Sequence, residues 1–207
     1  MNSEDWEEFD KIVREVFAPV YPVIARKIVE MTRIKDGICI DIGTGTGALA
    51  ISIARTTNLK VYALDVSKKA LEIAKKHIKS EQLDSRVIPV LGDVHNMPFK
   101  INFADLIVSR GSISFWKDKV KAFREIYRVL KSDGVTFVGG GFGTKELKER
   151  ILKEMKKRDP EWNSKRGKTR RIKKDIDIIL SNAGIQNYKI IDDEANFWIV
   201  IRKEKKE

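Results

Sequence analysis

A run of alternating glycines and threonines, GTGTG at residues 43–47, follows a short apolar segment that contains an aspartate. Glycine loses more backbone freedom on folding than any other residue, so a cluster of three indicates a turn that needs unusual backbone angles or a close approach. Where such a turn joins a strand to a helix, backbone N–H groups and the helix dipole attract negative charge. The stretch therefore predicts a binding site for a ligand that carries an anionic group.

Three aspartates end or follow three successive apolar runs: Asp41 in ICIDI, Asp65 in KVYALDV and Asp93 in RVIPVLGD. If these runs are neighbouring parallel strands, the three carboxylates lie at the same edge of the sheet. The segment GTGTGA also satisfies the loose dinucleotide fingerprint, with an acid about 20 residues further on. Asp41, however, would repel a pyrophosphate and would suit an ammonium group. Together, the glycine loop and the three aspartates favour a ligand that is a nucleoside carrying an amino acid.

The elements that must position these residues follow an alternating pattern. Short apolar runs without polar alternation are typical of strands buried on both faces of a parallel sheet, and helical patterns lie between them. The expected strands are ICIDI, KVYALDV, RVIPVLGD, ADLIVS, GVTFVGG, QNYKIID and NFWIVIRKE, and the expected intervening helices cover 48–57, 67–82 and 118–134. Only DEA separates the last two strands, too short for a parallel crossover, so they must pair antiparallel. The pattern predicts an α/β fold with a mostly parallel seven-stranded sheet, an antiparallel C-terminal hairpin and helices on both faces.

Further helices flank this core. Apolar residues at helical spacing predict a helix over 5–17, and a second over 22–33 after the break at Pro19 and Pro22. Residues 144–159 form a charged amphipathic pattern, 159–171 a loop, and 171–184 a helix ended by Gly184. We expect one domain over 1–207, a cap formed by residues 1–33, and a basic helical segment at 143–183 that covers the substrate.

Composition excludes several classes. No apolar stretch is long enough to cross a bilayer, and the first residues are acidic where a secretory signal would be basic, so a cytoplasmic protein without membrane association is expected. The one cysteine, Cys39, excludes disulfides and cysteine-based metal sites, lies in an apolar run and is expected to be a buried, inert thiol; no metal site is predicted. Abundant Lys, Glu and Ile also resemble the composition of a thermophilic protein.

The formal net charge of +11 is concentrated in one segment. The segment from Lys145 to Lys174 contains fourteen Lys or Arg residues and five Asp or Glu residues. This segment is either an electrostatic footprint for RNA phosphates or a lid whose charges are solvated or attract an anionic metabolite. Because charged runs are usually solvated and no separate RNA-binding module is present, we favour the lid.

As a set, these motifs resemble the class I S-adenosylmethionine-dependent methyltransferases, in particular the type 11-like group related to quinone-pathway enzymes. DIGTGTG is similar to the D/E-x-G-x-G-x-G motif of that family, ALDVS to its acidic second-strand motif and GDVHNMPF to its third motif. ADLIVSRGS corresponds to the fourth strand, and LKSDGVTFVGG to the helix end, turn and fifth strand. The resemblance covers about residues 35–142 and implies a Rossmann-like methyltransferase fold with S-adenosylmethionine as cofactor.

The resemblance also implies roles for individual residues. Glycine-loop residues would surround the methionine end of the cofactor, Asp41 would order the loop or meet the ammonium, Asp65 would accept from both ribose hydroxyls, and Asp93 would accept from the adenine amino group. The full set of implied cofactor-binding residues is Asp41, Gly43, Thr44, Gly45, Gly47, Asp65, Val66, Gly92, Asp93, Val94, Ser109 and Tyr21. Val66 and Val94 would lie on the adenine faces, Ser109 near the methionine, and Tyr21 would close over the cofactor.

The methyl acceptor is less well defined. Methyl transfer from a sulfonium is an in-line displacement that requires positioning more than a catalytic side chain, so none is assigned. Candidate substrate-binding residues are Arg110, Ser112, Phe115, Trp116 and His95. Arg110 would either pair with an acidic substrate group or be a solvated loop residue. Phe115 and Trp116 would either form a wall of the pocket or belong to the core. His95 is a candidate general base, although a position in a loop at the rim of the adenine site is favoured. The stretch SRGSIS lacks the N/D/S-P-P-Y/F pattern of enzymes that methylate exocyclic amino groups of bases.

The sequence therefore predicts a methyltransferase that acts on a small-molecule acceptor. Two alternatives stay open at this point: an RNA methyltransferase that uses the basic segment, and a non-catalytic cofactor-binding or regulatory protein. The oligomeric state is not predicted.

Overall fold

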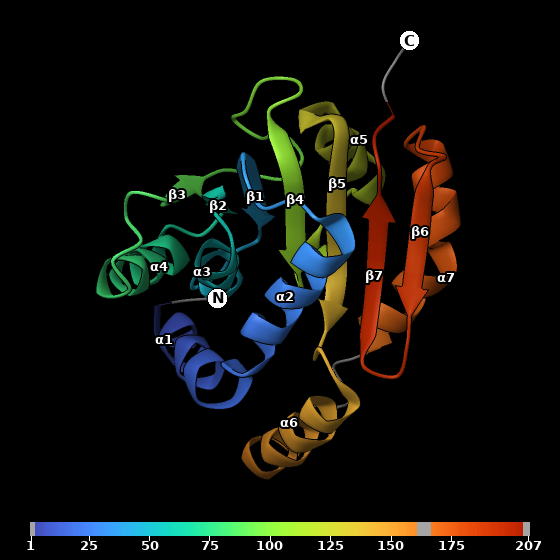
Figure 1. Ribbon diagram of the computed structural model, residues 1–207. Helices are drawn as coiled ribbons and strands as arrows, with labels where there is room; N and C mark the ends of the chain where they lie inside the picture. The colour runs from blue at the N-terminus through green and yellow to red at the C-terminus, as the bar shows by residue number, and fades with distance from the viewer. Residues whose placement is uncertain (1–2, 161–166, 205–207) are drawn as a thin grey trace.

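The computed structural model describes residues 3–160 and 167–204, and within these ranges the side chains of residues 3 and 167–171 are not described. One mixed sheet of seven strands runs in the order β3-β2-β1-β4-β5-β7-β6 (Figure 1). The strands are β1 Ile38–Ile42, β2 Lys60–Asp65, β3 Val87–Leu91, β4 Ala104–Arg110, β5 Leu130–Gly141, β6 Tyr188–Asp192 and β7 Asn196–Ile201. The pairs from β3 to β5 are parallel, and β7 is antiparallel to both β5 and β6. This is the predicted fold class.

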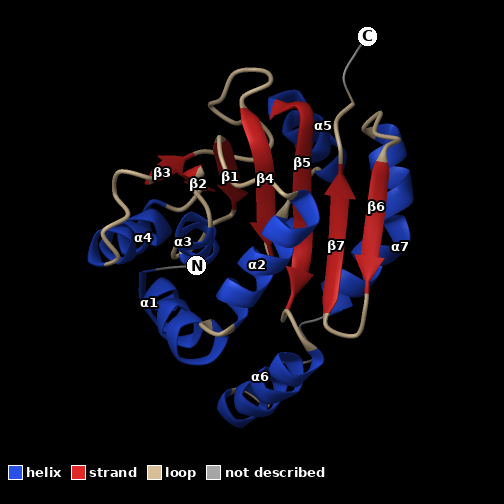
Figure 2. Cartoon of the chain, viewed as in Figure 1, coloured by secondary structure: helices blue, strands red, loops and turns tan. Residues whose placement is uncertain are grey.

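Helices cover both faces of the sheet, with α2 and α3 on one face and α5 and α7 on the other (Figure 2). The helical elements are α1 Ser3–Ile12, η1 Val13–Phe17, α2 Val20–Thr32, α3 Ala48–Thr56, α4 Lys68–Ser80, η2 Ile113–Phe115, α5 Lys119–Val129, α6 Lys145–Arg158 and α7 Gly167–Asn182. Each face has its own apolar cluster, one around Ile24 and Ile53 and the other around Phe123 and Ile176. The central strands of the sheet therefore lie between two apolar clusters.

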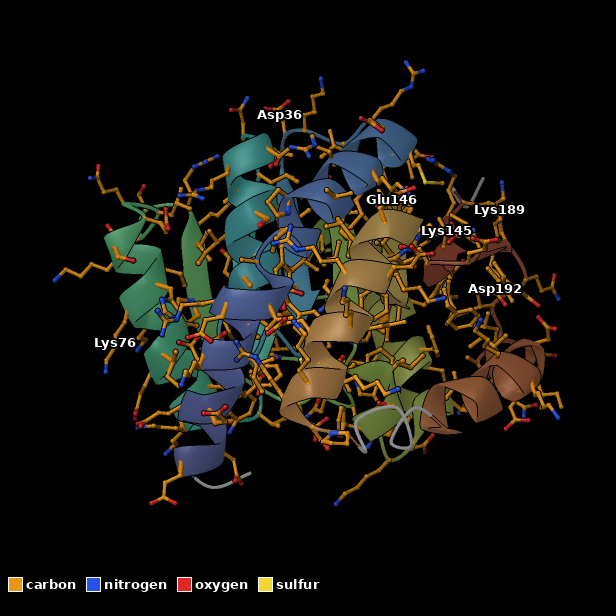
Figure 3. The ribbon with its side chains drawn as sticks, turned by 90° about the horizontal axis from the view of Figure 1, so that it is seen from below. Asp36, Lys76, Lys145, Glu146, Lys189 and Asp192 are labelled. Atoms are coloured by element: carbon orange, nitrogen blue, oxygen red, sulfur yellow. The ribbon has the colours of Figure 1, made fainter. Side chains whose placement is uncertain are left out.

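The order of the strands reverses between β1 and β4, which are adjacent in the sheet although two strands separate them in the chain. In open α/β sheets, ligands bind at such a switch point, outside the carboxyl ends of the strands. Figure 3 looks from below onto this edge, and the ribbons of α1 and α6 lie across it. At its start, α6 is tied to the β6–β7 hairpin, because Lys145 forms an ion pair with Glu194 at 2.9 Å.

Several boundaries differ from the sequence prediction near the N-terminus. The helix expected over 5–17 is not continuous, because α1 ends at Ile12 and the turn over Val13–Phe17 is π-helical. The second helix begins at Val20, two residues before the predicted start, with Pro22 inside its first turn. Proline is tolerated there because the first N–H groups of a helix have no intrahelical partner.

Two further boundaries differ in the second half of the chain. The helix expected to run to 134 ends at Val129, because Leu130 takes an extended conformation and pairs with Ala104 of β4. Helix α7 begins at Gly167, within the stretch 159–171 that was expected to be a loop. The expectation that the run RVIPVLGD, like the other four runs of the parallel core, forms a strand buried on both faces was wrong, because β3 lies at the edge of the sheet and Leu91 is exposed.

Candidate active site

The glycine loop adopts the conformation that its composition requires. Gly43, Gly45 and Gly47 have φ angles of +67°, +56° and +89°, in the left-handed region that favours glycine. A Cβ on Gly43 would lie 2.4 Å from the Cβ of Ser112, so the loop after β1 and the loop after β4 pack too closely for a side chain. The turn ends at Gly47, which caps the N-terminus of α3.

The N–H groups at the start of this loop are engaged within the protein. Those of Gly43 and Thr44 donate to the carbonyl of Leu64 at 2.8 and 3.0 Å, and that of Gly45 donates to Oδ2 of Asp65 at 2.9 Å. These three groups therefore bind protein acceptors, and the expected attraction of an anion to the loop is reduced accordingly.

Asp41 places a buried carboxyl beside this loop. Its side chain is 1% exposed and accepts a hydrogen bond from the Thr44 hydroxyl at 2.7 Å. Burial raises the pKa of Asp41 from 3.8 to about 7, and hydrogen bonds from Thr44 and the backbone of Ala50 in α3 offset only part of that effect. A carboxyl that is costly to ionise favours a cation beside it, because the cation would stabilise the charged form.

Two further acidic residues lie along the same edge of the sheet, in the direction of β3. Asp65 ends β2 and also accepts from the Ser67 N–H at 2.9 Å, yet each carboxylate oxygen keeps a lone pair for another donor. The adjacent Val66 is 67% exposed, so its side chain offers an apolar surface against which a flat ring could pack. A carboxylate beside an exposed valine suits the ribose and base of a nucleoside.

Beyond the end of β3, Asp93 is fixed by His95. Burial of Asp93 opposes its ionisation, but hydrogen bonds from the His95 backbone and ring outweigh this effect and lower its pKa. The His95 Nε2 accepts from the N–H of Asp118 at 3.2 Å, which assigns the proton to Nδ1, and Nδ1 then donates to Asp93. Both ring nitrogens are thus occupied, an arrangement that positions Asp93 and leaves no lone pair for a general base.

Other residues of the predicted set are held by packing. Gly92 lies where a Cβ would be 2.8 Å from Leu64, and Val94 is buried in the core. Ser109 is fully buried and its hydroxyl lies 2.6 Å from that of Ser112.

Ser112 connects the two loops, because it donates to the Ile42 carbonyl and accepts from Trp116 Nε1, both at 3.2 Å. The indole of Trp116 packs against Phe123 with ring centroids 5.7 Å apart, so Trp116 belongs to the core. Phe115, by contrast, is 76% exposed.

Arg110 is not a solvated loop residue. It ends β4, is half-buried, and its guanidinium carbon lies 5.3 Å from the ring centroid of Phe17 and 4.9 Å from that of Tyr21. Its Nε donates to the Gly141 carbonyl at 3.0 Å, and one Nη lies 3.4 Å from the Tyr21 hydroxyl. Tyr21 is buried, and burial raises its pKa.

Residues of α1 complete the site, and the sequence prediction did not assign them to it. A Cβ on Gly45 would lie 3.5 Å from Phe9 and 3.8 Å from Trp6. Asp10 and Glu7 of this helix pair with His77 and Lys69 of α4, at 2.8 and 3.2 Å. The aromatic stripe of the amphipathic helix was the available signal, but it did not indicate which surface the stripe would cover.

No group of three or more His, Cys, Asp or Glu in ranges 3–160 and 167–204 is arranged to hold a metal ion. Among the same residues, no helix is long and apolar enough to span a membrane. Cys39 is fully buried, as expected, and burial raises the pKa of its thiol.

Comparisons with known proteins agree with this geometry. A family model described as a methyltransferase domain matches residues 40–138. A solved structure from Methanococcus maripaludis, assigned as an S-adenosyl-L-methionine-dependent methyltransferase, is 45% identical, covers 100% of this chain and 95% of its own, and has a TM-score of 0.96. The chain therefore belongs to the class I S-adenosylmethionine-dependent methyltransferases.

Curated relatives match over shorter stretches. The chloroplastic 2-methyl-6-phytyl-1,4-hydroquinone methyltransferase of Arabidopsis thaliana is 38% identical over 46% of this chain and 27% of its own length. The mitochondrial arginine-hydroxylase NDUFAF5 of Mus musculus is 32% identical over 69% of this chain and 38% of its own. The chain thus spans well under half the length of either relative, and their names describe different reactions.

Proposed function

We propose that the protein transfers a methyl group from S-adenosylmethionine to a small-molecule acceptor. The observation that carries the proposal is the buried carboxyl of Asp41 beside the glycine loop, with Asp65 and exposed Val66 next along the same edge. This arrangement fits the ammonium and sulfonium charges and the nucleoside of that cofactor better than it fits a pyrophosphate.

In this proposal, Gly43, Thr44, Gly45 and Gly47 surround the methionine end, Asp41 meets the ammonium, and Asp65 accepts from the ribose. Val66 and Val94 contact the adenine faces, and Gly92 and Asp93 lie at its edge, while Ser109 and Tyr21 bound the methionine side. The cofactor supplies an activated methyl group, so the chain's own residues bind, orient and exclude water. No side chain is assigned to proton transfer, since His95 is engaged with Asp93 and Asp118.

The domain organisation belongs to the same proposal: a single domain over 1–207, with residues 1–33 as a cap and 143–183 as a lid. It is supported by the position of α1 beside Gly45 and by an ion pair of 2.8 Å between Glu15 of η1 and Arg158 of α6. Cap and lid thus contact each other near the edge where the acceptor would enter. A cytoplasmic location and a thermophilic source stay predictions from composition alone.

Isothermal titration calorimetry with S-adenosylmethionine, S-adenosylhomocysteine and NAD tests the cofactor. We expect micromolar binding of the first two, weakened at least tenfold by Asp65→Ala, and no binding of NAD. Tight NAD binding without a response to S-adenosylmethionine would refute the proposal. Binding of S-adenosylmethionine without methyl transfer to any fraction of a cell extract would instead favour the non-catalytic alternative.

The RNA alternative rests on the basic segment 145–174. Several of its charges are already paired: Lys157 and Arg158 contact Glu154, and Lys173 contacts Asp192. Lys165 and Arg166, which belong to this basic segment, lie outside the described residues, as do the side chains of Lys168, Arg170 and Arg171. Transfer of labelled methyl only into the RNA fraction of an extract would establish this alternative.

A further inference from the structure

The methionine end of S-adenosylmethionine carries an ammonium and a carboxylate on the same carbon. Asp41 is the proposed partner of the ammonium, and its ionised carboxyl would repel the carboxylate. The glycine loop offers little compensation, because four of its N–H groups already donate to acceptors of the protein, those of Gly43, Thr44, Gly45 and Gly47. The carboxylate of the ligand therefore needs a positive partner outside the loop.

Arg110 lies on the same face of the sheet as Asp41. Strands β1 and β4 are parallel neighbours, with Asp41 opposite Val108. Cys39 and Val108 belong to the apolar cluster that includes residues of α2, and alternate residues of a strand point to the same face. Asp41 follows Cys39 by two positions and Arg110 follows Val108 by two. Both side chains therefore point to the face that α2 covers.

Both charges act on Tyr21 of α2, which is proposed to bound the methionine side of the cofactor. Burial raises the pKa of Tyr21, the positive charge of Arg110 lowers it, and the negative charge of Asp41 raises it. One Nη of Arg110 lies 3.4 Å from the Tyr21 hydroxyl. The hydrogen-bond partners of the two charged groups are otherwise different, Thr44 for Asp41 and the Gly141 carbonyl for Arg110. Opposite charges thus lie near one tyrosine without forming an ion pair with each other.

No carboxylate among the described residues pairs with Arg110. Its contacts there are a carbonyl, a hydroxyl and two aromatic rings. Other cations around this edge are paired: Lys69 of α4 with Glu7, and Arg158 of α6 with Glu15. A half-buried cation without a counter-ion is unfavourable, so a ligand that supplies a negative charge would stabilise Arg110.

The guanidinium is held in place and keeps donors for a carboxylate. Of its five N–H groups, one at Nε and one at Nη are used, which leaves about three, enough for a bidentate contact. The ring centroids of Phe17 and Tyr21 lie 5.3 and 4.9 Å from its central carbon and restrict its movement. Binding a carboxylate therefore requires little further ordering of the side chain.

We propose that Arg110 binds the carboxylate at the methionine end of S-adenosylmethionine, while Asp41 binds the ammonium. The two residues together then select a ligand that carries both charges on one carbon. This inference rests on the proposed methyltransferase function. It assigns Arg110 to the methyl donor, although the sequence prediction grouped it with the candidates for substrate binding.

Calorimetry at pH 8, where Asp41 is ionised, with three ligands tests this assignment. Decarboxylated S-adenosylmethionine keeps the ammonium, and methylthioadenosine has neither group. We expect the wild type to bind S-adenosylmethionine about tenfold or more tighter than the decarboxylated form, the factor typical of a charge-assisted contact. Arg110→Met should lose this preference through weaker binding of S-adenosylmethionine alone. Unchanged binding of methylthioadenosine would show that the variant folds.

Three further variants serve as controls. Asp41→Asn should weaken binding of S-adenosylmethionine and of its decarboxylated form alike, because both carry the ammonium. Arg110→Lys should recover part of the preference, since it keeps the charge without the planar fork. Arg26→Met, which removes an exposed arginine of α2, should have no effect on any of the three ligands.

Two results for Arg110→Met would overturn the proposal. An equal loss of affinity for S-adenosylmethionine and its decarboxylated form would show that Arg110 supports the structure of the site without contacting the carboxylate. An unchanged affinity for S-adenosylmethionine would show that Arg110 does not contact the donor. If the wild type binds none of the three ligands, the proposed methyltransferase function fails as well, an outcome distinct from either of these.

Discussion

The raised pKa of Asp41 makes a quantitative prediction about stability. The folded protein holds a proton on Asp41 up to about pH 7, whereas the unfolded chain releases it near 3.8. Between these values the unfolded state binds fewer protons, so the free energy of unfolding falls as the pH rises. The shift of about 3 units, at about 1.4 kcal/mol per unit, corresponds to a loss of about 4 kcal/mol that is complete above pH 7.

Asp41→Asn removes the titration while keeping an oxygen that accepts from Thr44. The difference in unfolding free energy between the variant and the wild type should therefore change with pH, in favour of the variant, by about 4 kcal/mol from pH 4 to pH 8. Denaturant unfolding at a series of pH values measures this difference. A difference that stays constant over that range would show that Asp41 ionises normally in the folded protein.

Asp193, in the turn between β6 and β7, provides a control of opposite sign. Burial opposes its ionisation, but hydrogen bonds from Asn196 and the Ala195 N–H outweigh this effect and lower its pKa in the folded protein. The stability that it contributes is therefore present above the unfolded pKa and is lost as the pH falls below it. Asp193→Asn should consequently give a constant difference from the wild type between pH 5 and 8. A change in that window for both variants would indicate a general response of the fold to pH and would contradict the assignment to Asp41.

Three further predictions concern the same edge. Affinity for S-adenosylmethionine should fall by up to about tenfold per pH unit below pH 7 in calorimetry, because ionised Asp41 is the form that binds an ammonium, and the dependence should disappear in Asp41→Asn. Gly43→Ala, whose Cβ would be placed 2.4 Å from Ser112, should lower the melting temperature and weaken cofactor binding, whereas Gly184→Ala, also at positive φ but with open space around it, should cost about 1–2 kcal/mol and leave binding unchanged. His77→Ala should accelerate hydrogen exchange in α1 without changing exchange in the strands, since it removes a 2.8 Å contact between α4 and that helix; equal protection of α1 in both proteins would show that the contact is not what holds the helix.

Local patterns were sufficient for the scaffold and for the cofactor edge. The apolar runs gave the strands to within a few residues in most cases, and the short DEA link required the antiparallel pairing now seen between β6 and β7. The glycine loop was predictable because its backbone angles exclude most other residues. The position of Asp65 at the edge of the sheet was predictable because Asp65 ends a strand, and this placement does not depend on contacts with distant parts of the chain.

Contacts between distant segments were not accessible in the same way. The sequence did not decide whether Arg110 contacts the substrate or is a solvated side chain, because its neighbours Phe17 and Tyr21 come from helices near the N-terminus. The engagement of His95 depends similarly on Asp118 at the start of α5. Such arrangements depend on packing between elements that are distant in the sequence. The spacing of residues along the chain carries no information about that packing.

The glycine loop itself illustrates why a motif does not define its ligand. The same G-x-G-x-x-G/A spacing serves pyrophosphate sites, where free N–H groups at a helix N-terminus bind the anion. Here the N–H groups of Gly43, Thr44 and Gly45 already donate to Leu64 and Asp65. The carboxyl of Asp41, close to the Ala50 N–H in the first turn of α3, takes the place that a phosphate would need. The acid before the glycines thus changes the preference of the loop from an anion to a cation, and it is this residue, more than the glycines, that distinguishes a methionine-derived cofactor from a dinucleotide.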